Sequence, residues 1–290
     1  MAIRKKVLIL GGSGFVGTNL ARDLSLSYSV TCTHRNRVTK LKDVNYIAFQ
    51  GLTERDLCKS LMLATKPDVV IYAVGSNDID SAERDSRTAQ YQHTAGATYL
   101  QAASEGVKAK FVYLSSDTIF SGHAGNYAEE DITIPSSALG KAKMGAENHI
   151  RGRSLNYIIV RSAPLLGRGP LDHPSWVDRL RESALIKKKF KVSERLIRNP
   201  IHIGLLSEVI SYSIEYDLKN KILHLGGLTK VSEHELALRI SKANDIATEN
   251  LEVLTTGRPD SIYDFSLNFS QTLTVCKYPI LTLQQSMERL

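Results

Sequence analysis

The sequence predicts an α/β protein with a doubly wound parallel sheet, followed by a smaller α+β region toward the C-terminal end. Runs of apolar residues such as Val7–Leu10 have no polar face, which is typical of strands buried on both sides. Segments with helical spacing of apolar residues separate these runs as far as Arg161. Beyond Arg161 the alternation becomes irregular, and prolines and glycines crowd between residues 164 and 174, which indicates a loop and a domain boundary.

The expected strands are short and rich in apolar or β-branched residues: Val7–Leu10, Ser29–Thr33, Asn45–Phe49, Pro67–Gly75, Lys110–Ser116 and Asn156–Arg161. The expected helices between them run from Phe15 to Leu24, over Asp56–Ala64, over Ala82–Ala103, and from Pro135 to about Ile150. The later region predicts helices over Trp176–Ile186 and Ile203–Tyr216 and from Ser232, with short strands at Lys191–Val192 and Ile222–Leu225. We therefore assign residues 1–160 to a first domain and 161–290 to a second region, some of whose segments return to the first.

The first strand is followed at once by a glycine-rich turn and a helix. Two overlapping patterns are present, G-x-G-x-x-G from residue 12 and G-x-x-G-x-x-G from residue 11. Such glycines permit a tight turn, let a pyrophosphate approach the backbone, and lead into a helix whose free N–H groups bind the anion. Because the strand and the helix are both present, we interpret the turn as a Rossmann-type dinucleotide site, with an ordinary glycine-rich turn as the alternative. The residues expected to touch the cofactor here are Gly11, Gly14, Phe15, Val16 and Gly17.

Segments after the second and fourth strands would complete this site, because the carboxyl ends of parallel strands meet at one edge of the sheet. Arg35 and Arg37 follow the second strand, where NAD-binding proteins usually carry an acidic residue for the ribose 2′-OH. No Asp or Glu occurs between residues 31 and 42, so an arginine facing a 2′-phosphate predicts NADP, with NAD as the alternative. The residues assigned to the cofactor are His34 and Arg35 after the second strand, and Ala73, Val74 and Gly75 at the end of the fourth.

Composition narrows the class of protein and of partner. The net charge of +7 favours anionic ligands such as nucleotides. The densest basic run, Lys187–Lys191, lacks the interleaved aromatic residues of a nucleic-acid groove and is interpreted as a solvated face. No apolar run approaches the ~18 residues of a membrane-spanning helix. The three cysteines are far apart and without a C-x-x-C pattern, so we expect reduced thiols, no metal site and a cytoplasmic location.

Several longer motifs make the chain resemble the extended short-chain dehydrogenase/reductase superfamily, nearest to its dTDP-4-dehydrorhamnose reductase branch. The resemblance covers most of the chain and includes the glycine turn, Pro67–Ile71, Tyr113–Gly122, Pro135, Gly140–Glu147, Val160–Ser162 and Asn199–His202. It implies a ketone on a nucleotide sugar as the substrate and NADPH or NADH as the reductant. It also implies that residues 161–290 bind the substrate.

The same resemblance implies a catalytic Tyr, a Lys four residues later, a Ser or Thr after the preceding strand, and an Asn in the long helix. Ser116 and Lys143 match, and Lys143 would also bind the nicotinamide ribose. Leu139 stands at the Tyr position and has no proton to give, and His93 stands at the Asn position. Only Tyr127 or His93 could take over as the acid. The alternatives are that Ser116 terminates a strand and that His93 is a packing histidine.

The substrate-side residues are assigned on the same basis, as groups suited to an anionic diphosphate: Arg161, Arg195, Arg198 and His202. Each could instead be a surface charge. Two main functions stay open at this point: an NADP-dependent nucleotide-sugar reductase, and a non-catalytic dinucleotide-binding regulatory or scaffold subunit like that of methionine adenosyltransferase in the same branch. The chain would work as a homodimer or with a partner subunit. A nucleic-acid-binding Rossmann protein is a weaker third hypothesis, suggested only by the charge.

Overall fold

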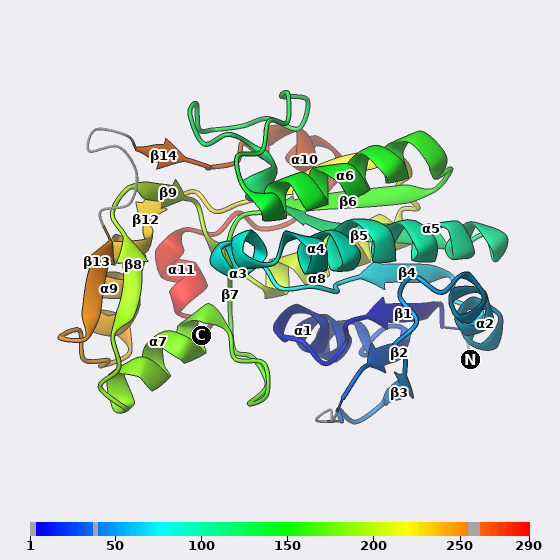
Figure 1. Cartoon of the computed structure of the whole chain (residues 1–290), viewed down its shortest axis with the longest axis horizontal. Coiled ribbons are helices and arrows are strands. Elements are labelled where there is room, and N and C mark those ends of the chain that lie inside the picture. The colour runs from blue at the N-terminus through cyan, green and yellow to red at the C-terminus, as the bar shows by residue number, and fades with distance from the viewer. Residues whose placement is uncertain (1–3, 37–39, 255–261) are drawn as a thin grey trace.

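One parallel sheet of seven strands forms the body of the molecule (Figure 1). The structure is a computed structural model, and it describes residues 4–36, 40–254 and 262–290. The strand order is β11-β6-β5-β4-β1-β2-β3, with every neighbouring pair parallel. The strands are β1 (Lys6–Leu10), β2 (Ser29–His34), β3 (Val44–Ala48), β4 (Val69–Tyr72), β5 (Lys110–Ser116), β6 (Tyr157–Ser162) and β11 (Lys221–Leu225). This order confirms the predicted doubly wound Rossmann-type sheet.

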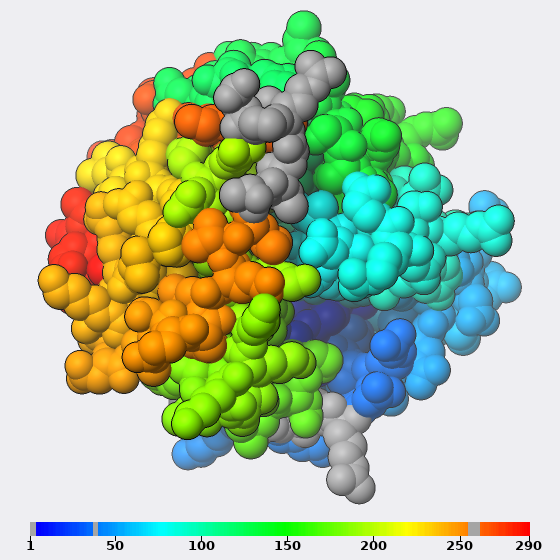
Figure 2. All heavy atoms as spheres, turned by 60° about the vertical axis from the view of Figure 1, so that its left-hand side comes forward, coloured from blue at the N-terminus to red at the C-terminus, as the bar shows by residue number. Residues whose placement is uncertain are grey.

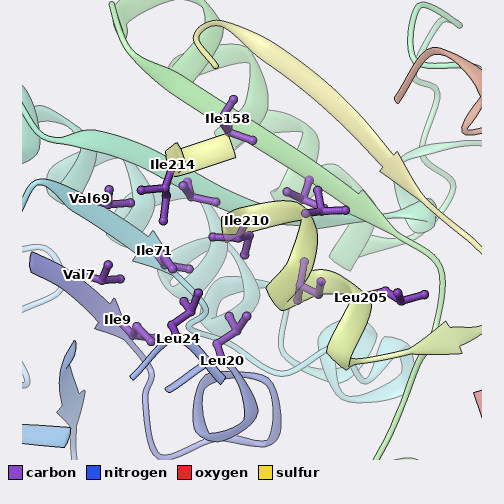
Figure 3. Packing of buried hydrophobic residues seen from close by; sticks show 14 of the residues in the cluster. Val7, Ile9, Leu20, Leu24, Val69, Ile71, Ile158, Leu205, Ile210 and Ile214 are labelled. Atoms are coloured by element: carbon purple, nitrogen blue, oxygen red, sulfur yellow. The ribbon is translucent and has the colours of Figure 1, made fainter. Parts of the chain in front are cut away.

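Alternating side chains of the strands supply two separate cores, one on each face of the sheet. Val7 and Ile9 point to one face, where helices α1 (Phe15–Leu24) and α8 (Gly204–Glu215) cover them, as Figure 3 shows. Leu8 and Leu10 point to the other face, which α2 (Arg55–Thr65), α5 (Gly96–Gly106) and α6 (Ala138–Arg153) cover. Burial on both faces explains why these strands read as unbroken apolar runs.

The long helix expected over Ala82–Ala103 is divided into four segments. They are α3 (Ile79–Arg84), α4 (Ser86–Gln90), a π-helical turn (Tyr91–Ala95) and α5. The first break lies at Asp85, whose backbone is not helical (φ −138°, ψ 77°) and whose carboxylate accepts a hydrogen bond from Thr88 N–H. Asp85 therefore caps a new helix, which the apolar spacing alone did not indicate.

The second part of the chain contributes both to the sheet and to a smaller lobe. α8 and β11 return to the sheet, as does α10 (Ser270–Val275), which packs beside β11. The smaller lobe has its own apolar core around Leu166, Leu180 and Ile240. Its elements are α7 (Trp176–Leu185), β8 (Phe190–Ser193), β9 (Leu196–Arg198), β12 (Val231–Ser232), α9 (Glu233–Ala243), β13 (Leu251–Leu254), β14 (Tyr263–Asp264) and α11 (Leu283–Met287).

Short pairings and polar contacts join the lobe to the sheet. β7 (Leu165–Leu166) pairs with β10 (Ile201–His202), and the Asn19 side chain in α1 donates a hydrogen bond to Arg168 O at 2.8 Å. Within the described part of the chain, no helix is long and apolar enough to cross a membrane. The lobe thus lies beside the carboxyl ends of the strands, where the glycine turn is also found (Figure 1).

Candidate functional site

The turn between β1 and α1 has the backbone that its glycines predict. Gly11 has φ +81°, and a Cβ there would lie 2.6 Å from Ala73 O. A Cβ on Gly17 would lie 2.2 Å from Gly11 O, so this close approach of helix to turn requires glycine. Gly14 is the extended N-cap of α1, which leaves the N–H groups of the first turn, including those of Phe15 and Val16, open for an anion.

The neighbouring strand ends meet this turn. Thr33 at the end of β2 anchors it, because its carbonyl accepts from Gly12 N–H at 2.9 Å and its hydroxyl from Gly11 N–H at 3.2 Å. Just beyond, His34 is half-buried and Arg35 is exposed. Arg37 lies outside the described residues. The structure therefore brings β2 to the glycine turn, with Arg35 free to face solvent or a ligand.

The segment from Ala73 to Gly75 completes this edge. Ala73 N–H donates to Leu10 O at 3.0 Å, which continues the parallel pairing beyond β4. Gly75 has φ +108°, and a Cβ there would lie 2.4 Å from the imidazole of His93. Ala73, Val74 and Gly75 thus lie between the glycine turn and the helix that carries His93.

His93 is locked into the protein interior. Its side chain is 2% exposed, and its Nε2–H donates to Ser76 O at 2.9 Å. Burial, assisted by the nearby Lys143 charge, lowers the pKa of His93 to about 3. His93 is therefore neutral near pH 7, and its ring fixes the loop after β4.

The π-helical turn around His93 is stabilised by two core tyrosines. A π turn leaves carbonyl groups without their usual i+4 partners. Tyr72 Oη donates to Gln92 O, and Tyr113 Oη donates to His93 O at 3.2 Å. These bonds hold the widened turn, so that His93 reaches Gly75.

Lys143 and Ser116 come together at the carboxyl end of β5. Lys143 is 2% exposed and its ammonium donates to Leu114 O at 3.1 Å. Burial lowers the pKa of Lys143 to about 8, although Glu147 and Asp117 act in the opposite direction. The Ser116 hydroxyl lies 2.7 Å from that of Thr118. A largely charged ammonium and a hydroxyl therefore share one edge with the glycine turn.

Leu139 belongs to a small apolar cluster. It is 1% exposed and contacts an apolar cluster that includes Ile79, Ala82 and Ala89 from α3 and α4. The first turn of α6 itself begins at Ser137, whose hydroxyl accepts from Gly140 N–H at 3.0 Å. The side chain that we assigned by resemblance to the catalytic Tyr position therefore lies in an apolar cluster.

Tyr127 is held within its own loop. Its ring stacks on Phe120 with centroids 4.3 Å apart, and the side chain is buried. Its hydroxyl accepts from Ala124 N–H at 3.1 Å and lies 3.1 Å from Ser121 Oγ. These contacts engage the phenol, and its role as an acid stays a prediction.

We expected Arg161 to line a ligand site, but the structure places it in the protein interior. It is 1% exposed, and its Nη2 lies 2.7 Å from Glu147 Oε2. Its Nη1 donates to Glu129 O at 2.9 Å and to His224 Nε2 at 3.3 Å. His224 Nδ1 faces the carbonyls of Tyr127 and Asn268, so Nδ1 carries the proton and Nε2 accepts. The physical reason for the difference is that β6 directs this side chain onto Glu147 of α6.

The other substrate-side residues lie in or beside the smaller lobe. Arg195 is in the turn before β9, and Arg198 ends β9 with its Nε 3.4 Å from Asp117 Oδ2. His202 is half-buried, accepts at Nδ1 from Gly204 N–H at 3.1 Å, and has a pKa lowered by burial. The structure thus brings Arg198 to the end of β5, beside Ser116. Asp117 is the site residue that the sequence reasoning missed, although it directly follows Ser116.

The space for a ligand lies between the sheet and the smaller lobe. Figure 2 shows a hollow between the cyan and blue segments on one side and the yellow-green and orange segments on the other, with the dark-blue N-terminal segment at its floor. A separate cavity of about 300 Å³ opens at the amino ends of the strands, beside Lys6, Ser29 and Asn45. Ligands of open parallel sheets bind at the carboxyl ends, so we assign the site to the hollow in Figure 2.

Among the residues that the structure describes, no group of three or more His, Cys, Asp or Glu side chains is placed to hold a metal ion. Cys32, Cys58 and Cys276 are buried free thiols, and burial raises the pKa of each.

The chain is similar in sequence and in fold to proteins that are already known. The chain is 27% identical over 241 residues to a dTDP-4-dehydrorhamnose reductase of Aggregatibacter actinomycetemcomitans (81% of this chain, 78% of the relative). It is 23% identical over 266 residues to methionine adenosyltransferase 2 subunit beta of Rattus norvegicus (87% and 75%). The crystal structure of dTDP-4-dehydrorhamnose reductase from Bacillus anthracis in complex with NADP superimposes with a TM-score of 0.84 at 20% identity, covering 99% of this chain and 98% of that one. The model of the RmlD substrate binding domain family matches residues 5–261, and the chain therefore belongs to that family.

Proposed function

We propose that the protein binds NADP(H) across the glycine turn and holds a nucleotide-linked sugar in the hollow between the sheet and the smaller lobe. The observation that carries this proposal is the backbone of the turn, in which Gly11 and Gly17 leave no space for a Cβ and Gly14 exposes the start of α1. The similar Bacillus anthracis reductase was crystallised with NADP. NAD is the alternative cofactor, because the similar enzyme WbmH of Bordetella bronchiseptica was crystallised with NAD+.

Each side chain at the site has a role in this proposal. The N–H groups of the first turn of α1 bind the pyrophosphate, and Arg35 binds the 2′-phosphate. Lys143, whose ammonium now donates to Leu114 O, would donate to the nicotinamide ribose, and the Ser116 hydroxyl, now 2.7 Å from that of Thr118, would orient a carbonyl. Reduced nicotinamide, when bound, supplies a hydride. The alkoxide that results from hydride transfer requires a proton donor.

The proton donor is the weak point of the site. Leu139 has no acidic proton, His93 is neutral and bonded to Ser76, and the Tyr127 hydroxyl is engaged within its loop. The loss of a general acid costs ~10²–10⁴ in rate. We therefore propose a binding site that is complete for the cofactor and that reduces ketones slowly.

A second candidate function follows from the same observation. The apolar packing of Leu139 favours a non-catalytic subunit that binds a dinucleotide and acts on a partner protein. The similarity to methionine adenosyltransferase 2 subunit beta supports this alternative. The buried free thiols support the proposed cytoplasmic location, and assembly as a homodimer or with a partner subunit belongs to the proposal as well.

Two measurements test the proposal. NADPH binding is followed by the fluorescence of the reduced nicotinamide, and turnover by the loss of NADPH absorbance with a panel of 4-keto nucleotide sugars. We expect binding, and slow turnover that Leu139→Tyr raises by ~10²-fold or more, since it restores the general acid. The matched control is Leu139→Phe, which adds the ring without the hydroxyl and should leave the rate unchanged.

The other outcomes distinguish the candidates. Absence of NADPH binding would refute both functions. Binding without turnover, even in Leu139→Tyr, would favour the non-catalytic subunit. Fast turnover by the unmodified protein that Tyr127→Phe abolishes would mean that Tyr127 donates the proton.

A further inference from the structure

A cluster of charged side chains lies where the smaller lobe meets the end of β5. Asp117 follows directly after β5, and Arg198 is the last residue of β9. Glu233, the first residue of α9, and Asp80, in the first turn of α3, interact electrostatically with this cluster. Lys143 of α6 also interacts with Asp117. Five segments of the chain therefore bring two cations and three carboxylates together.

The central pair of this cluster is left incompletely bonded. Asp117 is 1% exposed, and its Oδ2 accepts no hydrogen bond. Arg198 Nε faces it at 3.4 Å without hydrogen-bond alignment, and Arg198 Nε and Nη2 are buried without an acceptor. Buried polar groups are satisfied in most native structures, because an unmade bond costs ~1–3 kcal/mol. A donor and an acceptor that both lack a partner indicate a place where another molecule supplies one.

The guanidinium is held in position, and the Arg198 side chain keeps a small exposure. Its carbon lies 5.6 Å from the centroid of the Phe265 ring, in a cation–π arrangement. The Arg198 side chain is 15% exposed, whereas that of Asp117 is 2% exposed. Arg198 is therefore the more accessible member of the pair.

The charge around this pair disfavours a phosphate. Asp117 and Glu233 both interact with Arg198, and Asp80 adds a third carboxylate nearby. Burial raises the pKa of Asp117 to about 6 and raises the pKa of Glu233. The three carboxylates outnumber the two cations, Arg198 and Lys143, and this charge balance disfavours a dianionic diphosphate. A hydroxyl group, by contrast, both donates and accepts, so it can satisfy the carboxylate and the guanidinium together.

We propose that Asp117 and Arg198 form a subsite for the uncharged, hydroxyl-bearing sugar ring of a nucleotide-linked ligand, and not for its diphosphate. One ring hydroxyl donates to Asp117 Oδ2, and the same or an adjacent hydroxyl accepts from Arg198. This inference rests on the proposed function for the position of the nucleotide, and it revises the expectation that Arg198 binds a diphosphate. It makes Arg198 and Asp117 determinants of which sugar is bound.

The test compares ligands that differ only in the sugar. Binding of dTDP and dTDP-glucose, and of UDP and UDP-glucose, is measured by isothermal titration calorimetry in the presence of NADP. We expect the protein to bind a sugar nucleotide about tenfold more tightly than the matching nucleoside diphosphate. Asp117→Asn and Arg198→Met should abolish that tenfold difference while changing the affinity for the nucleoside diphosphate less than twofold.

Controls separate this role from a structural one. Lys230→Met removes the cation of another ion pair of the smaller lobe, with Asp264 at 3.0 Å, and should keep the tenfold difference. Arg198→Lys keeps the charge without the planar fork and should lose most of the difference, which provides a variant if Arg198→Met unfolds.

Three results would overturn the inference: equal affinity of the unaltered protein for diphosphate and sugar nucleotide, no binding of any of the four ligands, or an equal loss of both affinities in the variants. If the unaltered protein does not bind NADPH but still binds sugar nucleotides more tightly than the matching diphosphates, the proposed function is refuted and this inference stands. If the protein binds NADPH but binds sugar nucleotides and diphosphates equally, this inference is refuted and the proposed cofactor binding stands.

Discussion

The buried ion pair between Glu147 and Arg161 allows a quantitative test of how this site is held. Arg161 donates from Nε and Nη2 to the Glu147 carboxylate at 2.7–3.2 Å, and both side chains are 1–2% exposed. Glu147→Gln leaves the guanidinium buried without a counter-charge. Removal of one partner of such a pair costs about 3–5 kcal/mol. Since domains unfold with ~5–15 kcal/mol, we expect this variant to lose a large part of its stability.

The assay is urea denaturation followed by circular dichroism. Glu147→Gln and Arg161→Met should each lower the free energy of unfolding by about 3–5 kcal/mol. The double variant Glu147→Leu with Arg161→Met should recover most of it, because neither charge of the pair remains. The exposed i,i+4 pair of Arg239 and Glu235 on α9 supplies the control. Arg239→Met should change stability by less than ~1 kcal/mol.

Two results would refute this reasoning. One is a cost below about 1 kcal/mol for Glu147→Gln, which would mean that the pair is not buried as the structure has it. The other is an Arg161→Met variant with unchanged stability and weakened sugar-nucleotide binding, which would return Arg161 to the ligand site where the sequence placed it.

Three further predictions concern the cofactor and pH. Gly17→Ala should abolish NADPH binding in the fluorescence assay, because its Cβ would lie 2.2 Å from Gly11 O. The control variant Gly106→Ala, whose Cβ meets no atom within 4 Å, should bind NADPH normally. Equal binding by both variants would contradict the assignment of the glycine turn to the cofactor. Arg35→Ala should weaken NADPH about tenfold and leave NADH unchanged, as one lost charge-assisted contact implies, and a parallel loss of both would assign Arg35 elsewhere. Burial lowers the pKa of His224 from its ordinary value of 6.5 to about 3 in the folded protein. Stability is therefore lost as pH falls below 6.5, because only the unfolded chain takes up the proton. Between pH 8 and pH 5 the unaltered protein should therefore lose about 2 kcal/mol more unfolding free energy than His224→Asn, and equal losses would show that His224 is not the group responsible.

Local sequence was sufficient for the sheet and the glycine turn. A strand buried on both faces must be apolar throughout, and a turn that brings a helix within contact of the preceding backbone must use glycine. Both requirements concern residues that are neighbours in the sequence. The strand Val7–Leu10 and the turn Gly11–Gly17 can therefore be predicted from the sequence alone. Ser116 and Lys143 were assigned from the sequence as well, through the resemblance of the longer motifs to the family.

Only the tertiary structure decided which charged side chains meet one another. Asp117 and Arg198 meet because β5 ends beside a lobe formed much later in the chain, and Arg161 is withdrawn because its strand directs it onto Glu147. Likewise, His93 became a neutral support for the loop after β4 because the π-helical turn places it against Gly75. An arginine in a sequence has the same charge whether it meets solvent, a ligand or a buried carboxylate. Its partner is determined by the packing of segments that are distant in the sequence, so the local sequence pattern does not predict it.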